Sequence, residues 1–182
     1  LIGDADLSNQ PPTITSAATS SSSESEVDAV DGSTWIIERG SSANLSVGAS
    51  DEGGSSALKF TWNVVGPAPV YINPNGSNLS STTSVEFEQS GDYIATVTVT
   101  DESGLAASSS CNLRVLQTSS ALVVSPAAAV LSVGQSQNFT ATLNDQFGSA
   151  MASQPASVEW TAAGGGLIDA SGNFTASAAG GP

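Results

Sequence analysis

The most constraining feature of this sequence is a two-residue alternation of apolar and polar side chains. The alternation runs through residues 43–49, 58–65, 85–88, 93–99 and 111–115. Such alternation is typical of antiparallel strands with one buried and one solvated face. Clusters of Asp, Asn, Gly and Pro separate the segments as turns, and no stretch carries a helical stripe. The sequence therefore predicts an all-β chain built as an antiparallel sandwich.

The same alternation divides the chain into two parts. A short polar linker at 117–120 ends the first part, and the pattern then restarts. The restarted pattern covers residues 122–126, 139–143, 158–162, 167–168 and 173–175. Residues 158–162 repeat the layout of residues 60–64, each around one tryptophan, so the two parts form a loose tandem repeat.

These signals predict a linker over residues 1–10, a first sandwich over 11–117 and a second over 118–182. Within the first sandwich, the acidic stretch 17–31 lacks periodicity and predicts a long surface loop inserted into the domain. The second part is shorter than the ~100 residues typical of such a sandwich. We therefore expect its last strand or strands to be missing, which leaves an open sheet edge that another chain can pair with.

Composition excludes several classes of function. Three Lys and Arg residues stand against 17 Asp and Glu residues, for a net charge of -14, so the surface repels nucleic acid and anionic lipid. No apolar run approaches the ~20 residues of a membrane span. There is no histidine and one cysteine, Cys111, which excludes Ser-His-Asp and Cys-His catalysis and ordinary zinc sites within this chain. We expect no enzyme activity, and we expect Cys111 to be a small buried apolar residue.

The first part resembles one known family. Residues 91–101 open with Gly-Asp-Tyr, continue with alternating valines and end in Asp, and they resemble the closing strand of polycystic kidney disease (PKD) domains. Trp62 matches the core tryptophan of that family, and Asp51 with Gly53-Gly54 matches its turn after the second strand. The resemblance covers residues 11–117, with the stretch 17–37 longer than the family needs there. It implies an immunoglobulin-like sandwich.

The second part is similar to bacterial immunoglobulin-like repeats. The matching stretches are residues 124–126, 133–135, 139–141, 145–148, 160 and 172–176. Such repeats, alone or beside PKD-like modules, are found in large exported bacterial proteins that include adhesins and polysaccharide-degrading enzymes. The resemblance implies an extracellular or cell-surface module with a spacer, adhesion or glycan-contacting role and without catalysis.

Five aromatic side chains are candidates for structural or binding roles. Trp62 and Trp160 lie in the apolar phase of their segments and are expected in the core. Tyr93 follows a glycine turn at the start of a strand, as in a tyrosine corner, where the hydroxyl bonds to nearby backbone. Trp35, next to the acidic stretch, and Tyr71, in an expected surface loop, are candidates for stacking on a sugar ring. For Trp35 the competing interpretation is packing against the sandwich edge.

Four acidic side chains are candidate calcium ligands. Asp51 and Glu52 follow the second strand, and Asp101 and Glu102 precede the last strand of the first sandwich. In this topology the two loops lie at the same end, where four carboxylates repel one another unless a cation lies between them. The competing interpretation is that these acids are solvated turn residues, with Asp favoured for local turn hydrogen bonds.

Together these observations favour a non-catalytic spacer or adhesion module of an exported bacterial multidomain protein or surface assembly. Its partners are then other domains of the same polypeptide or neighbouring subunits. Two alternatives stay open. One is a carbohydrate-binding accessory module of a secreted enzyme, with a polysaccharide as the partner. The other is a polymer subunit whose incomplete second part is completed by a strand from a neighbouring chain.

Overall fold

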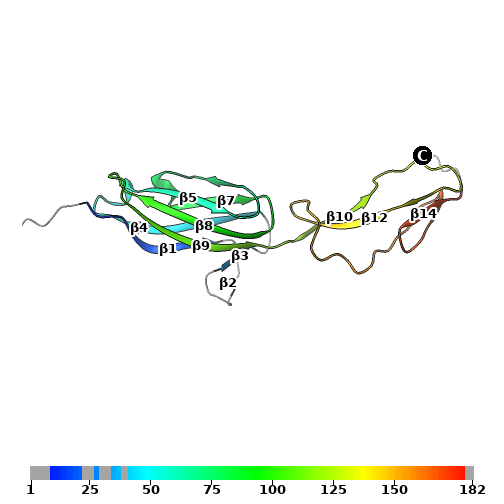
Figure 1. Cartoon of the computed structure of the whole chain (residues 1–182), viewed down its shortest axis with the longest axis horizontal. Helices are drawn as coiled ribbons and strands as arrows, with labels where there is room; N and C mark the ends of the chain where they lie inside the picture. Colours follow the sequence, from blue (N-terminus) through cyan, green and yellow to red (C-terminus); the bar gives the residue numbers. More distant parts are fainter. Residues whose placement is uncertain (1–8, 22–26, 29–33, 38–40, 179–182) are drawn as a thin grey trace, which may run out of the picture. The chain divides into compact units, whose positions relative to one another are not determined.

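A computed structural model describes residues 9–21, 27–28, 34–37 and 41–178 (Figure 1). The chain divides into two compact units, unit 1 (Leu1–Thr118) and unit 2 (Ser119–Pro182). The division lies one residue from the boundary that the sequence predicts. No α-helix occurs in the described ranges, and the two short 3₁₀ turns, η1 (Ser55–Ala57) and η2 (Asn78–Ser81), both belong to unit 1.

Unit 1 consists of two sheets. Sheet A has the order β1-β4-β7-β6, formed by β1 (Thr13–Ser21), β4 (Ser42–Ser50), β7 (Thr82–Phe87) and β6 (Val70–Asn73). Sheet B has the order β2-β3-β9-β8-β5, formed by β2 (Val27–Asp28), β3 (Thr34–Ile37), β9 (Ala106–Val115), β8 (Gly91–Thr100) and β5 (Lys59–Val65). Every strand pair in unit 1 is antiparallel except β3 with β9, which is parallel.

The core of unit 1 lies between the two sheets. Outside β1, the buried apolar side chains of its long strands are those that the alternation assigns to the inner face, among them Leu45, Val85, Phe87, Phe60, Trp62, Tyr93, Val97, Val99 and Leu113. The rings of Phe87 from sheet A and Tyr93 from sheet B meet with centroids 4.8 Å apart. The all-β sandwich predicted from the alternation is therefore confirmed.

The prediction of a loop over residues 17–31 is wrong at its start. Strand β1 continues to Ser21, and Ala18 and Ser20 are buried. The backbone N–H of Ala18 donates to Ser109 Oγ on β9 at 2.9 Å. Small Ser, Thr and Ala side chains fill this edge of the sandwich without an apolar alternation, so the pattern did not reveal the strand. Strand β2 also falls within the predicted loop, while residues 22–26 and 29–31 of that loop lie outside the described residues.

Unit 2 holds two small sheets. Strands β10 (Ser119–Ser125) and β12 (Thr140–Asp145) form one, and β11 (Ser136–Asn138), β14 (Asn173–Ala176) and β13 (Gly166–Ile168) form the other in that order with β14 central. The predicted strand at 158–162 is wrong, because these residues carry no strand. Among the described residues of unit 2, Ala176 is the one apolar side chain that is fully buried. Unit 2 therefore follows the predicted pattern only in part.

Candidate functional site

The two acidic turns of unit 1 lie at the same end of the sandwich, as the topology predicts. We call this end, marked by Ser50 and Thr100, the amino-terminal pole. Two hydrogen bonds tie residues before β1 to it. Asn9 Nδ2 donates to Asp101 Oδ2 at 2.5 Å, and the backbone N–H of Gln10 donates to Glu52 Oε1 at 2.6 Å. The last residues of the predicted 1–10 linker are thus fixed to unit 1, whereas residues 1–8 lie outside the described residues.

The environment of these carboxyls favours their charged form. Burial of Asp101 raises its pKa. Hydrogen bonds from the Asn9 amide and from nearby backbone N–H groups together lower the pKa by more than burial raises it, so the pKa ends below its ordinary value. The backbone N–H of Leu105 donates to Asp101 Oδ1 at 2.8 Å. The pKa of Glu52 is also lowered, chiefly by the N–H of Gln10, while the neighbouring charge of Asp101 opposes the shift.

The predicted calcium site is only partly assembled. Asp51 and Asp101 both lie close enough to Glu52 to affect its pKa, but Glu52 and Asp101 already accept hydrogen bonds from backbone and amide donors. Asp51 Oδ2 accepts the Gly53 N–H at 3.2 Å, and Asp51 Oδ1 is buried without a donor. Glu102 is exposed. Within the described part of the chain, no three such side chains are grouped so that they could hold a metal ion. Calcium binding by these four acids stays a prediction.

A recurring turn explains why aspartate occurs at positions 101, 145 and 169. Asp101, Asp145 and Asp169 each accept, through Oδ1, the backbone N–H of the residue four positions later, at 2.8, 3.0 and 3.0 Å. The residue three positions later is a glycine with φ of 88°, 79° and 80°, respectively, whose N–H donates to the carbonyl of the same Asp. The left-handed φ favours glycine. The sequence signal for this turn is the Asp-x-x-Gly segment, which occurs at 101–104, 145–148 and 169–172. It also occurs at 51–54, where the Gly54 N–H donates to the Asp51 carbonyl but the Asp51 carboxylate accepts the Gly53 N–H.

The structure places two of the three predicted structural aromatics in the core. Trp62 is 2% exposed, and its indole N–H donates to the Ser80 carbonyl at 2.8 Å. The Tyr93 hydroxyl donates to the Gln89 carbonyl at 2.8 Å, and burial of the Tyr93 side chain raises its pKa. This bond to the backbone four residues upstream is the geometry of a tyrosine corner.

The prediction of a strand-borne core position for Trp160 is wrong. Trp160 lies outside any strand and is half-buried. A Cβ added at Gly172 would lie 3.0 Å from the Trp160 ring, so the indole packs directly over that glycine. Its contact is with a turn of its own unit, because no complete opposing sheet is formed there.

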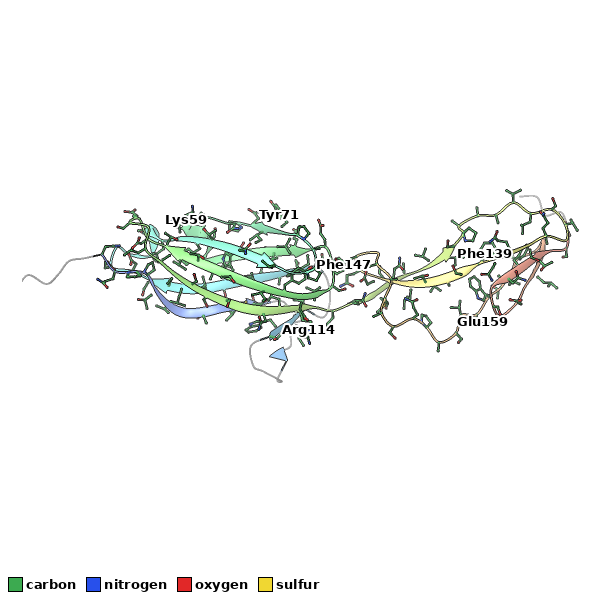
Figure 2. The ribbon with its side chains drawn as sticks, viewed as in Figure 1. Lys59, Tyr71, Arg114, Phe139, Phe147 and Glu159 are labelled. Carbon is green, nitrogen blue, oxygen red and sulfur yellow. The ribbon has the colours of Figure 1, made fainter. Side chains whose placement is uncertain are left out.

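The two aromatics predicted to contact sugar lie in different environments. Trp35 pairs with Leu113 in the parallel β3–β9 ladder and is half-buried, which favours packing at the sandwich edge. Tyr71 lies on strand β6, not in the surface loop that the sequence predicts, and is 62% exposed. Figure 2 shows Tyr71 projecting outward from the edge of unit 1.

Cys111 is buried and free, and burial raises the pKa of its thiol to about 11. At neutral pH the thiol is therefore protonated, which suits an inert core residue.

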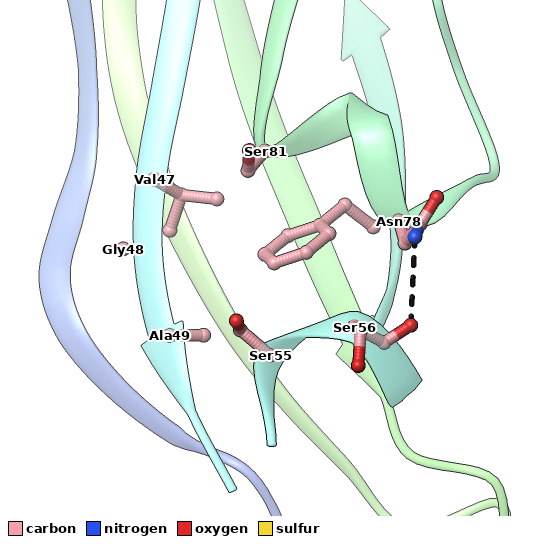
Figure 3. Close-up of a pocket in the computed structure, with 8 residues that line it drawn as sticks. Val47, Gly48, Ala49, Ser55, Ser56, Asn78 and Ser81 are labelled. Carbon is pink, nitrogen blue, oxygen red and sulfur yellow. Dashed lines mark hydrogen bonds between the residues drawn. The ribbon is translucent and has the colours of Figure 1, made fainter.

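A cavity of about 410 Å³ opens beside β4 near the amino-terminal pole. Its lining residues are Val47, Gly48, Ala49, Ser55, Ser56, Phe60, Asn78 and Ser81. Figure 3 shows Val47 and Ala49 on one side and serines of the two 3₁₀ turns on the other, with Asn78 Nδ2 donating to the Ser56 carbonyl at 3.5 Å. The lining carries no ionisable group, so the cavity offers hydrogen bonds but no acid–base chemistry.

Comparison with known proteins gives similarity of structure only. No family model and no curated protein match the chain. Drosophila N-cadherin EC1-4 is similar over 92% of this chain and 41% of that one, with 16% identity and a TM-score of 0.50. The PKD domain from the KIAA 1837 protein is similar over 52% of this chain and 87% of its own, with 27% identity and a TM-score of 0.37.

A third solved structure is a nucleoside hydrolase-related hypothetical protein from Saccharophagus degradans that is associated with carbohydrate metabolism. It is similar over 59% of this chain, with 20% identity and a TM-score of 0.42, and this chain spans 26% of its length. The chain therefore spans less than half of this protein and of the cadherin fragment. The cadherin likeness shows the fold alone, which is all-β and immunoglobulin-like.

Proposed function

We propose that the chain is a non-catalytic spacer and adhesion-type module of an exported multidomain protein, as in the bacterial surface proteins that its sequence resembles. The observation that carries this proposal is the path of the backbone through unit 1. The backbone enters at one end of the sandwich and leaves at the other, and hydrogen bonds hold both ends.

The two ends are separated by the full length of the longest strands. Asn9 and Gln10 are held at the amino-terminal pole by Asp101 and Glu52. Strand β9 starts beside that pole, pairs with all of β8 and ends where Val115 lies opposite Gly91. There the backbone N–H of Leu116 donates to the Ile37 carbonyl at 3.0 Å. Ten-residue strands with a rise of about 3.3 Å per residue separate the two poles by about 30 Å.

This path suits a segment that bears tension. Force applied to Asn9 and Leu116 acts along β1 and β9, in opposite directions and parallel to the strands. The ladders of β1 with β4 and of β9 with β8 and β3 are then loaded along their length. Their hydrogen bonds must break together and not one after another, which resists extension. The acidic surface supports solubility outside the cell.

No helix among the described residues is long and apolar enough to cross a membrane. The proposed location is extracellular or at the cell surface. The partners are the domains that precede or follow the module, or neighbouring subunits.

Single-molecule extension of the whole chain tests the spacer function. We expect one cooperative rupture for unit 1, with a gain in contour length of about 3.5 Å for each residue released. A double substitution, Asn9→Ala with Glu52→Ala, removes the two side chains that tie the first residues to the amino-terminal pole. It should shorten the segment that ruptures without abolishing the event. Extension of the wild-type chain without a cooperative rupture would contradict the proposal.

A second candidate function is acceptance of a strand from a neighbouring chain, and one observation favours it. Leu122, Val123 and Val124 are consecutive on β10 and are 49%, 45% and 41% exposed. Within the described residues, β10 pairs with β12 alone, so its other edge carries no described strand. Consecutive apolar residues are typical of strands covered on both faces. Natural edge strands usually carry charges that prevent pairing, and β10 has none.

Sedimentation of the whole chain at increasing concentration tests this second function. Association should be lost in Val123→Lys and retained in Val65→Lys, a matched control at an exposed valine of unit 1. A chain that stays monomeric at all concentrations, or associates equally in both variants, would contradict strand acceptance between copies.

A further inference from the structure

The outer face of sheet A carries an exposed aromatic ring among short polar side chains. Tyr71 lies on β6, the edge strand of the sheet, with Val70 and Ile72 on either side half-buried toward the core. The Tyr71 side chain therefore belongs to the solvent face, where 62% of it is exposed. Its phenol hydroxyl has no hydrogen-bond partner among the described residues.

The strand register identifies the neighbours of Tyr71. Tyr71 lies opposite Glu86 on β7, and Glu86 lies opposite Ser42 on β4. The next row of the same face joins Asn73, Ser84 and Asn44. Directly opposed side chains on one face have Cβ atoms about 5 Å apart. We call the surface formed by Tyr71, Asn73, Ser84, Glu86, Ser42 and Asn44 the Tyr71 face.

We propose that the Tyr71 face binds a neutral saccharide chain. One side of a sugar ring presents C–H groups, which pack on the π-face of an aromatic side chain. The rim of the sugar ring presents hydroxyls. Those hydroxyls meet side-chain amides that both donate and accept, serine hydroxyls that do the same, and the Glu86 carboxylate, which accepts two bonds. The Tyr71 face brings these groups together in two adjacent rows of residues, each of which crosses β6, β7 and β4.

Charge selects the class of saccharide. The chain has a net charge of -14, and Glu86 lies directly opposite Tyr71 in the strand register. A uronic or sulfated polysaccharide would be repelled by both the local and the overall charge. A neutral chain of sugar residues meets no such repulsion, and its hydroxyls are suitable donors to Glu86.

This inference goes beyond the spacer function and does not depend on it. A module that bears tension does not need a glycan site, and a glycan site does not need resistance to force. Failure of saccharide binding would leave the extension experiment unaffected, and the reverse also holds.

The opposite sheet provides a matched control. Val65 on β5 is also 62% exposed, and it lies opposite exposed Ile94 on the outer face of sheet B. That pair is apolar and exposed but has no aromatic ring. A signal that arises only from exposed apolar surface should therefore respond to Val65 as it does to Tyr71.

Affinity electrophoresis of the whole chain tests the inference. Native gels contain xyloglucan, galactomannan, mixed-linkage β-glucan or dextran as neutral probes, and polygalacturonate as the anionic probe. We expect at least one neutral probe to retard the wild-type chain and polygalacturonate to leave its migration unchanged. Retardation by none of the four neutral probes, or by polygalacturonate alone, would overturn the inference.

Variants then locate the site. Tyr71→Ala should weaken the apparent affinity about tenfold, because one stacked ring carries much of such an interaction. Tyr71→Phe should stay within about threefold of wild type, and Val65→Ala should be unchanged. Because Tyr71 is exposed, thermal unfolding of Tyr71→Ala should match wild type, which shows that the variant is folded. A folded Tyr71→Ala variant that binds like wild type would overturn the assignment to this face.

Discussion

Unit 1 and unit 2 have similar compositions but differ in how many apolar side chains they bury. Both are uncommonly rich in Ser, Thr, Ala and Val, and both contain strands joined by Asp-x-x-Gly turns. Yet apart from Ala176, all fully buried apolar side chains of the described residues belong to unit 1. In unit 2, Leu122, Val123 and Val124 stay exposed on β10.

The difference shows what alternation can and cannot specify. A period of two assigns each side chain to one face of a strand, but burial also needs a second layer opposite that face. In unit 1 two sheets of four and five strands supply that layer for each other, whereas unit 2 has sheets of only two and three strands. The alternation around Trp160 therefore produced neither a strand nor a buried tryptophan.

The largest expected effect comes from the tryptophans. Trp62→Ala removes a 2% exposed ring and leaves the Ser80 carbonyl without its donor, so the free energy of unfolding of unit 1 should fall by about 3–5 kcal/mol. Trp160→Ala, in a separate unit, should leave that transition unchanged. Urea unfolding followed by far-ultraviolet circular dichroism measures both. Equal losses for the two variants would show that the units do not differ as described.

A smaller effect is expected from Gly66, which packs against the Tyr93 ring. A Cβ at position 66 would overlap that ring, so Gly66→Ala should destabilise unit 1 by about 1–3 kcal/mol. Gly53→Ala is the control, because its Cβ would meet Asp51 Oδ2 at an ordinary 3.4 Å. Thermal unfolding of the two variants should differ clearly. A wild-type melting temperature in Gly66→Ala would show that the tyrosine corner is loosely packed.

Acid should weaken unit 1 through the carboxyls of its amino-terminal pole. The pKa values of Asp101 and Glu52 are lowered in the folded state, so their stabilisation is present above the ordinary carboxyl values of about 4. It is lost as the pH falls through the lower folded values. Asp101→Asn should flatten this acid limb in urea unfolding from pH 7 to pH 3, whereas Glu102→Gln, exposed in the same turn, should not. An unchanged limb in Asp101→Asn would contradict this assignment.

The calcium prediction concerns the smallest effect. If the four acids bind Ca²⁺ with the weak affinity of extracellular modules, then about 10 mM Ca²⁺ should raise the melting temperature of unit 1 by a few degrees. Asp51→Asn should remove the rise, since Asp51 Oδ1 is the buried oxygen without a donor. A melting temperature that stays constant in Ca²⁺ would contradict the calcium prediction and support the interpretation of these acids as solvated turn residues.

The sequence predicted most of unit 1 because its strands signal their inner face clearly. Val97 and Leu113 alternate with polar residues, and each is buried as the pattern requires. The alternation did not reveal strand β1, because its buried residues Ala18 and Ser20 are small and belong to no apolar pattern. Their burial depends on contact with β9, some ninety residues later in the chain, which no local pattern contains.

The candidate site was predicted less well than the fold. The sequence grouped Asp51 and Asp101 at one pole correctly, but it could not show that donors such as Asn9 already occupy the Asp101 carboxylate. Nor could the sequence place Tyr71 on an edge strand. The segment 70–73 is only four residues long and is flanked by prolines, a pattern that indicates a loop. The Tyr71 face exists only once β6, β7 and β4 are aligned in register.

The Asp-x-x-Gly turn has a consequence for the order of folding. Its hydrogen bonds join residues at most four positions apart, so the turn at Asp101 closes with little loop entropy before distant strands meet. Once closed, it fixes the register of β8 against β9. A slip of one residue would turn Tyr93 and its alternate neighbours toward solvent. One short carboxylate side chain therefore helps to determine, early in folding, which face of the hairpin becomes the interior.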